Sequence, residues 1–460
     1  MWKMTNPLLT YISDVRGLDW RPKVVLGAQT TNAIANGMIS FVIIFYVLSL
    51  GGTVVDFGIL NGFLVVCAII FGIASGIFSD RFRRDYMIWI GSAIMFFAIL
   101  ILIGRSLQNL MLGMIFIGIG NGLINPAFSG WMADITSNEN RDSIFSFQFM
   151  INTAFMSIGA IFAGTLFFAL GDSADIIYLV MLSALICFIP FMLAMFIIRD
   201  VRYIKKVSSP LNVEGVKELV EEIPSAPVQI SRPETAKVYE YSSRTPYIML
   251  ISQLVIAFGA GLSIPFIPLF LSQRYMLELG AIGYLEGATA IATGIGAVSS
   301  SLVSKRFGRV KVILVVQLIA TFVLLSLVFH LPLVVVIPFL LIRSSFMNMA
   351  NPLINTVVMS SISEKLRSTW SMVMQLGWQI LNVVGQVVGS LIILGLSFEN
   401  SFIITAVIYF VSVLSLLLIK ERITTKNLES DILTPDLEAK SGIEGTPTVL
   451  KAEESEFPTS

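Results

Sequence analysis

Two ionisable side chains lie inside long apolar stretches of the sequence. Glu286 occurs in the segment GYLEGATA and Arg343 in the segment LLIRSSF. A charge in apolar surroundings is costly, so such residues are rare and usually serve a function with an identifiable partner. The depths of these two residues in their segments are compatible with pairing. Two interpretations remain open: a structural Glu286–Arg343 ion pair, or a role in binding a substrate or a proton.

Amide side chains recur at helical spacing within the apolar stretches. Four of them, separated by 4, 3 and 4 positions, share one helix face: Gln375, Gln379, Asn382 and Gln386. Three further segments carry Gln29, Asn32 and Asn36; Asn121 and Asn125; and Asn348, Asn351 and Asn355. Lipid cannot satisfy amide groups, so these faces must point inward. They either hydrogen-bond between helices or line a wet cavity, and four aligned amides favour the cavity.

Motifs for catalysis or cofactor binding are missing from the sequence. It contains no Walker A motif, no HExxH motif and no cysteine–histidine spacing typical of a metal site, so we expect no enzyme, cofactor or metal. The segment GIGNG, from Gly118 to Gly122, resembles a phosphate-binding loop, but in an apolar helix its glycines favour close helix packing. Cys67 and Cys187 are interpreted as small buried residues.

The composition of the chain is apolar, and this indicates what kind of structure positions these residues. Of 460 residues, 55% are hydrophobic and 13% are charged, with mean hydropathy +0.84 and zero formal net charge. Soluble domains carry about 25% charged residues. The composition therefore excludes a soluble globular enzyme, a disordered chain and a disulfide-stabilised scaffold. Zero net charge also gives no general attraction to nucleic acid.

The apolar runs predict an all-α membrane protein with about twelve transmembrane helices in two six-helix bundles. A bilayer core about 30 Å thick requires roughly 20 apolar residues per helix. The first bundle, residues 23–198, contains runs at roughly 23–50, 55–78, 86–105, 107–131, 142–170 and 175–198. The second, residues 245–420, contains runs at roughly 245–272, 279–304, 311–329, 332–360, 367–396 and 399–420. Interruptions are expected at Asn125–Pro126, Pro265, Pro268 and Asn351–Pro352.

Charged residues gather in the three remaining segments. Residues 1–22 form an N-terminal segment, and residues 199–244 a linker whose apolar spacing between Pro210 and Pro224 predicts a short amphipathic helix. Residues 421–460 form an acidic tail for which disorder is expected. Basic residues concentrate in alternate short loops, and the positive-inside rule places those loops, the linker and both termini in the cytoplasm.

The two apolar halves repeat one another. Three features recur at one constant separation along the chain: Asn125–Pro126 with Asn351–Pro352, Arg141 with Arg367, and Gly159 with Gly385. A further match relates SDRFRR, starting at Ser79, to SKRFGR, starting at Ser304. Several matches in register indicate a duplicated six-helix unit.

This organisation resembles the major facilitator superfamily of secondary transporters over roughly residues 23–420. The superfamily's signature between its second and third helices, G-x-L-a-D-r-x-G-r-k, is matched at Gly76, Asp80, Arg81 and Arg84. Arg83 stands where the superfamily has its second glycine. In the repeat copy, Ser301 and Lys305 replace glycine and aspartate, and the retained positions are Arg306, Gly308 and Arg309.

The resemblance implies a latch that closes the cytoplasmic side. Asp80 can pair with Arg84 or with Arg141, and Gly76 would let two helices approach closely. The corresponding basic loops of the second half contribute Arg306, Gly308, Arg309 and Arg367. In the superfamily, helices 1, 4, 7 and 10 chiefly line the central cavity, with contributions from helices 2, 5, 8 and 11. The amide-bearing segments fall on those helices.

The expected function is secondary active transport of a small organic solute by alternating access, by a monomer in the cell membrane. Protons or sodium are the candidate coupling ions. An amide-rich lining with little buried charge favours a neutral or zwitterionic solute. Two alternatives remain: multidrug or metabolite efflux by proton antiport through Glu286, and a non-transporting receptor of the same fold.

Overall fold

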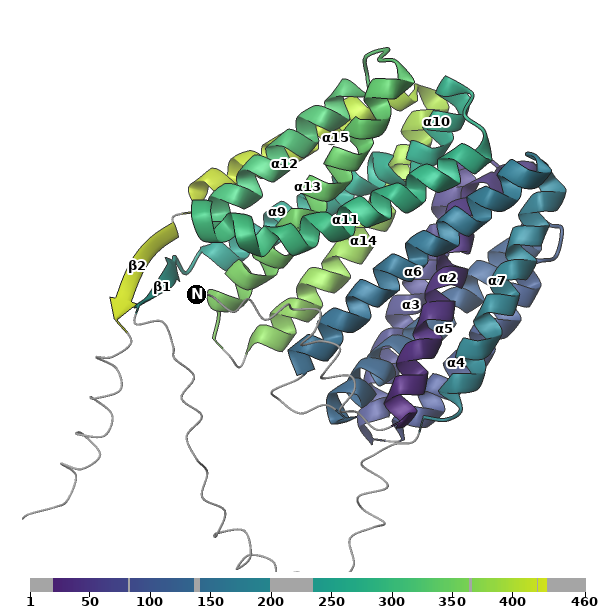
Figure 1. The fold of residues 1–460 in the computed structure, drawn as a ribbon, viewed down its shortest axis with the longest axis horizontal. Helices are drawn as coiled ribbons and strands as arrows, with labels where there is room; N and C mark the ends of the chain where they lie inside the picture. Colours follow the sequence, from purple (N-terminus) through teal and green to yellow (C-terminus); the bar gives the residue numbers. More distant parts are fainter. Residues whose placement is uncertain are drawn as a thin grey trace, which may run out of the picture. The chain divides into compact units, whose positions relative to one another are not determined.

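The computed structural model describes residues 20–81, 83–135, 141–198, 235–363, 366–419 and 421–427. Six long helices form the first half, coloured purple to blue in Figure 1. They are α2 (Trp20–Ser49), α3 (Val54–Arg81), α4 (Arg84–Leu102), α5 (Leu107–Ile135), α6 (Arg141–Leu170) and α7 (Ala174–Met195).

The second half, green to yellow in Figure 1, has the same succession of helices. It consists of α9 (Thr245–Ser263), the 3-10 turn η1 (Ile264–Phe266), α10 (Ile267–Tyr275), α11 (Leu279–Phe307), α12 (Arg309–Ser326), α13 (Leu333–Ser360), α14 (Arg367–Gly395), α15 (Phe398–Ser415) and η3 (Leu416–Leu418). The break at Pro265 and Pro268 is as predicted, because proline lacks the amide donor that a continuous helix needs. In contrast, α5 continues through Pro126 and α13 through Pro352.

The structure confirms the all-α membrane fold and its duplication. Twelve segments in the described part of the chain are long and apolar enough to cross a membrane. The helix starts repeat as the sequence does: α6 begins at Arg141 and α14 at Arg367, the two arginines that match between the halves. Corresponding helices of the two halves therefore begin at equivalent positions.

Two short strands form a second, separate unit. β1 (Thr235–Tyr241) pairs antiparallel with β2 (Glu421–Asn427), with Thr235 opposite Asn427 and Tyr241 opposite Glu421. The expectation of disorder from residue 421 onwards is wrong for this segment, because β-branched residues in ERITTKN favour a strand and a distant segment supplies its partner. The amphipathic helix predicted between Pro210 and Pro224, and the tail beyond Asn427, lie outside the described residues.

Glycines let α5 pack closely against two neighbours. A Cβ atom at Gly118 would lie 2.3 Å from the Leu64 carbonyl oxygen of α3, and one at Gly122 would lie 2.7 Å from that of Ala68. Gly120, on another face, approaches the Gly91 carbonyl oxygen of α4. These contacts confirm the interpretation of GIGNG as a helix-packing segment. Close backbone approach is a common basis of association between membrane helices.

Gly76 does not have the packing role expected of it. A Cβ atom there would meet no described atom within 4 Å. Beside Gly76, the Ser75 hydroxyl of α3 donates to the Leu123 carbonyl of α5 at 2.7 Å, and one turn earlier a Cβ atom at Gly72 would lie 3.8 Å from the Gly122 carbonyl oxygen.

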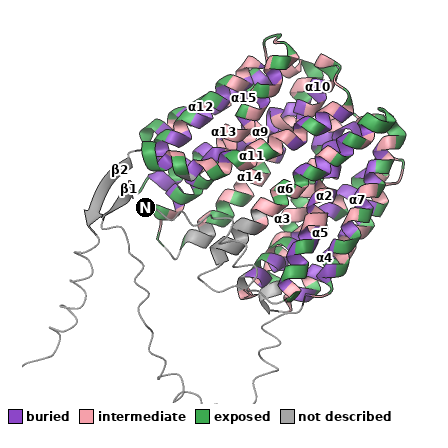
Figure 2. Cartoon of the chain, viewed as in Figure 1, coloured by how far each residue is buried: buried purple, intermediate pink, exposed green. Residues whose placement is uncertain are grey.

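Large apolar side chains cover much of the outer surface of the helices. Phe168 is 69% exposed and Val298 is 71% exposed, and exposed residues recur along the helices in Figure 2. A soluble protein rarely exposes so much contiguous apolar surface. This distribution matches helices that are solvated by lipid.

We predict that Gly118→Ala lowers the free energy of unfolding by about 1–3 kcal/mol, because the added methyl group would overlap the Leu64 carbonyl oxygen. Thermal unfolding of the purified protein in detergent measures the change. Gly27→Ala is the matched control, since a Cβ atom at Gly27 meets nothing within 4 Å. Equal stability of both variants would contradict the packing role of Gly118.

Candidate functional site

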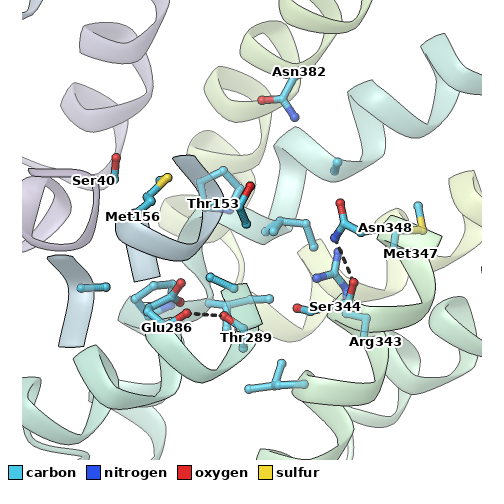
Figure 3. A pocket seen from close by; sticks show the side chains of 18 of the residues that line it. Ser40, Thr153, Met156, Glu286, Thr289, Arg343, Ser344, Met347, Asn348 and Asn382 are labelled. Carbon is cyan, nitrogen blue, oxygen red and sulfur yellow. Dashed lines mark hydrogen bonds between the residues drawn. The ribbon is translucent and has the colours of Figure 1, made fainter. Parts of the chain in front are cut away.

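A cavity of about 510 Å³ is lined by helices from both halves of the chain. The first half contributes residues of α2, α3 and α6, including Ser40, Thr153 and Met156. The second half contributes residues of α9 to α15, including Glu286 and Arg343. Figure 3 shows these side chains around the same space. We refer to this space as the central cavity.

The central cavity brings together the two ionisable residues singled out in the sequence. Glu286 lies on α11 and is partly buried, whereas Arg343 lies on α13 and is 6% exposed. The two side chains interact electrostatically, but they do not form a direct ion pair. The Thr289 hydroxyl donates to the Glu286 backbone carbonyl, 2.8 Å away, so the carboxylate itself receives no bond from it. The structural ion pair considered above is absent between these two described residues.

Three of the predicted amides also line the central cavity: Asn348, Asn351 and Asn382. The Asn348 side-chain nitrogen donates to the Ser344 carbonyl, 2.9 Å away, as Figure 3 shows. Asn351 in turn donates to the side-chain oxygen of Asn348, at 3.2 Å. These bonds fix the orientation of the amides and leave part of their hydrogen-bonding capacity for the cavity.

Three other predicted amides line a second cavity of about 330 Å³ in the first half: Asn32, Asn36 and Asn121. Asn36 donates to the side-chain oxygen of Asn32 at 2.9 Å. Asn61 of α3 lines the same space, and sequence reasoning missed it because it is the only amide of that segment. Ser40 and Phe57 line both cavities. The polar lining thus extends from one half to the other.

Besides Gln386, five predicted amides line neither of these two cavities. Gln29 is buried within α2, Gln379 is partly buried, and the other three are exposed, namely Asn125, Asn355 and Gln375. Helical spacing alone does not reveal how far along a helix a cavity extends.

The amide face of α14 serves two purposes. Asn61 donates to the side-chain oxygen of Gln386 at 3.0 Å, and Gln386 donates to that of Asn382 at 2.8 Å. Asn382 then donates to the Ala257 carbonyl of α9 at 3.2 Å. This chain connects α3 of the first half to α14 and α9 of the second. Interhelical bonding and cavity lining, the two alternatives left open by the sequence, therefore occur on one helix.

Several polar residues of the central cavity were missed in the sequence, and three of them have large side chains: Gln253 on α9, Gln317 on α12 and Tyr409 on α15. Each is the only residue of its type in its helix, so no stripe identified it. Their convergence is produced by helix packing.

The signature residues are described only in part. Arg84 forms an ion pair with Asp134 of α5 at 2.6 Å. Gly308 has φ +89° between α11 and α12, a conformation that favours glycine. Arg306 is exposed and Arg309 is partly buried. Outside the described side chains lie Asp80, Arg81, Arg141 and Arg367, so the predicted latch pairs stay predictions.

In the described part of the chain, the two halves meet chiefly along two pairs of helices, which we call seams. At the α6–α11 seam, a Cβ atom at Gly283 would lie 2.6 Å from the Gly164 Cα atom, and the Thr165 and Tyr284 hydroxyls are 3.2 Å apart. At the α3–α14 seam, the Asn61–Gln386 bond lies near Gly58. Both seams lie at the ends of these helices that are far from the loops rich in basic residues.

The sequence comparison decides the family. A model of the Major Facilitator Superfamily matches residues 25–235 and 249–447, which span most of the chain. The chain belongs to this superfamily. Its helical duplication and its cavity between two six-helix halves agree with that membership.

Several solved structures share the fold. A bacterial homologue of the human lysosomal transporter Spinster, inward-facing and unoccupied, is 13% identical with a TM-score of 0.62, over 87% of this chain and 98% of that one. The nucleoside transporter NupG is 12% identical with a TM-score of 0.64, over 87% and 98%. A bacterial homologue of the iron transporter ferroportin, in an inward-facing state, is 15% identical with a TM-score of 0.62, over 86% and 98%.

These similarities establish the fold and leave the substrate open. NupG and ferroportin are named for different cargoes, nucleosides and iron, and each of the three structures is at most 15% identical to this chain. A comparison with curated protein sequences finds no match.

We predict that Gln386→Leu lowers the melting temperature, because it breaks the bonds to Asn61 and Asn382 and leaves their amides unsatisfied. The loss should be about 1–3 kcal/mol. Gln375→Leu, on the same helix but exposed, is the control and should change stability little. If both variants melt alike in detergent, Gln386 does not connect the halves.

Proposed function

We propose that the protein is a secondary active transporter that moves a small neutral or zwitterionic organic solute by alternating access through the central cavity. The observation that carries the proposal is the convergence of Glu286, Arg343 and amide side chains on a cavity lined by both halves. In alternating access, two bundles rock around a site near the bilayer midplane. A site lined by both bundles can open to either side.

Glu286 is the candidate coupling residue. It lines the cavity, and no direct ion pair to Arg343 occupies its carboxylate. Such a carboxylate can accept and release a proton, or bind a cationic group of the solute, as the two bundles move. Arg343 lines the same cavity on the neighbouring helix α13 and lies within electrostatic range of Glu286. Protons are the favoured coupling ion, and sodium is the alternative.

The conformation is assigned as inward-facing. The positive-inside rule places the loops with Arg81, Arg141, Arg306 and Arg367 in the cytoplasm, together with both termini. The seam contacts described above lie at the opposite ends of α3, α6, α11 and α14, which supports closure of the outer side. Two of the structural relatives are themselves in inward-facing states, in agreement with this assignment.

The cytoplasmic latch would form when the inner side closes. We assign it to the signature residues Gly76, Asp80, Arg81 and Arg84, with Arg141 beside them, and to Arg306, Gly308, Arg309 and Arg367 in the second half. The Arg84–Asp134 pair, between α4 and α5 of the first half, is already formed in this structure and adds an acidic residue that the signature does not include. Exposed ion pairs contribute about 0–1 kcal/mol each, which suits a contact that must form and break in every cycle.

A second candidate function is efflux of apolar drugs or metabolites by proton antiport. Its specific support is the apolar side of the central cavity, lined by Phe41, Phe57, Met156, Met347 and Trp378. Both functions place a monomeric multi-pass protein in the cell membrane and use Glu286. Flux of the solute through purified protein in liposomes distinguishes either from a non-transporting receptor.

We predict that Glu286→Gln abolishes accumulation driven by a proton gradient, because an amide cannot exchange a proton. The solute comes from a thermal-shift screen of sugars, amino acids and cationic drugs, and the assay uses proteoliposomes. Counterflow exchange, which needs no net proton movement, should remain measurable. The steady-state ratio of inner to outer solute should fall to about one.

Glu278→Gln is the matched control, since Glu278 is exposed at the start of the same helix, α11. It should accumulate solute like the unaltered protein. Wild-type accumulation by Glu286→Gln from mildly acidic to mildly alkaline pH would refute coupling through Glu286.

A further inference from the structure

Four buried polar side chains around the central cavity have an atom without a hydrogen-bond partner in the described protein. They are Gln253 (Nε2), Gln317 (Oε1), Arg343 (Nε) and Tyr409 (hydroxyl). Their exposed fractions are 7%, 2%, 6% and 1%. They come from the four helices α9, α12, α13 and α15. We call them the unpaired quartet.

Several other buried hydroxyl groups of the second half are paired with one another, although the Thr245 hydroxyl at the start of α9 has no partner in the described protein. Ser252 and Ser412, on α9 and α15, lie 2.8 Å apart, and Ser263 lies 2.6 Å from Thr405. Buried polar groups in proteins are nearly always paired, so several exceptions at one cavity need an explanation. The helices that carry the quartet can form internal hydrogen bonds, yet four of the residues that line the cavity each keep a polar atom unpaired.

The chemistry of the quartet selects a carboxylate. Three of the atoms are donors: the Arg343 Nε–H, the Gln253 amide and the Tyr409 hydroxyl, which lies close enough to Arg343 to interact with its side chain. One guanidinium with two neutral donors matches a single negative charge on a planar group. A phosphate dianion would require more cationic partners.

The charge balance of the cavity agrees with this choice. Glu286 is the acidic residue and Arg343 the basic residue among those that line it. A solute with one carboxylate and one cationic group would compensate both charges, with its carboxylate at Arg343 and its cationic group at Glu286. The free acceptor, the Gln317 oxygen, can receive an N–H or O–H group of the same solute.

We propose that the unpaired quartet is a subsite for the carboxylate of the transported solute, which is therefore zwitterionic. This inference rests on the proposed transport function and selects one of its two substrate classes. Arg343 supplies the charge, while Gln253 and Tyr409 donate to the carboxylate oxygens. The solute completes the hydrogen bonding that the helices leave open.

Acetate is the probe, because it presents a carboxylate and little else. The full-length protein in detergent is melted with increasing sodium acetate, with sodium chloride at equal ionic strength, and with acetamide as the neutral isostere. We expect acetate to raise the melting temperature above chloride and acetamide in a saturable manner. General salt effects act equally on every variant, so the acetate-specific shift is the measured quantity.

Tyr409→Phe and Gln253→Leu test the subsite without removing its charge. Each should weaken acetate binding about tenfold or more, through loss of a hydrogen bond to a charged group. Neither should lower the melting temperature without acetate, since the buried donors that they delete have no partner to lose. Tyr46→Phe is the control, because the Tyr46 hydroxyl donates to the Leu102 carbonyl at 2.7 Å, outside both cavities. It should melt earlier and keep the acetate response.

Three results would overturn the subsite: no acetate-specific shift, an equal shift with chloride, or early melting of Tyr409→Phe in the absence of acetate. The result for Glu286→Gln is separate. Loss of accumulation in that variant with no acetate response would refute the subsite and leave coupling in place. If the protein responds to acetate but Glu286→Gln still accumulates solute, the subsite is supported and coupling through Glu286 is refuted.

Discussion

Every polar group at membrane depth must find a partner within the protein, because the surrounding hydrocarbon offers none. This constraint explains the hydroxyl pairs between α9 and α15, the amide chain from Asn61 through Gln386 to Ala257, and the persistence of helices through Pro126 and Pro352. Buried polar atoms without a hydrogen-bond partner are exceptions to this constraint. Four of the residues with an unpaired polar atom line the central cavity, namely Gln253, Gln317, Arg343 and Tyr409.

The two halves share one helical scaffold that arose by duplication, and the residues of the site differ between the two copies. Arg343 of α13 corresponds to Ile117 of α5 in the register that relates the two halves, and Ile117 lines the cavity of the first half. The second half therefore holds both the charged residues and the amides of the central cavity, while the amides of the first half line the second cavity. The signature loops diverged as well. Gly308 needs a positive φ, whereas Arg83, at the matching position, has an ordinary φ of −74°.

The seams between the halves combine close contact with few strong bonds. Gly164 and Gly283 let α6 and α11 approach closely, and one amide pair bridges α3 and α14. Small residues give van der Waals contact over short distances, and hydrogen bonds between membrane helices contribute only about 1–2 kcal/mol each. Such seams can separate and re-form. A covalent or strongly ionic seam would hold the two halves in a single state.

The sequence by itself determined the twelve helices, their duplication, the superfamily and the two charges at depth, because hydropathy, repeat spacing and rare intramembrane charges are local properties. It also placed amides on helix faces, but the end of a cavity along a helix is not local, so Gln375 and Asn355 prove to be exposed. The strand at Glu421–Asn427 needed a partner from a distant part of the chain. Only the tertiary structure brought Gln253, Gln317 and Tyr409 to the cavity of Arg343. Each is the only residue of its type in its own helix, and four helices must pack before their unpaired atoms share one cavity.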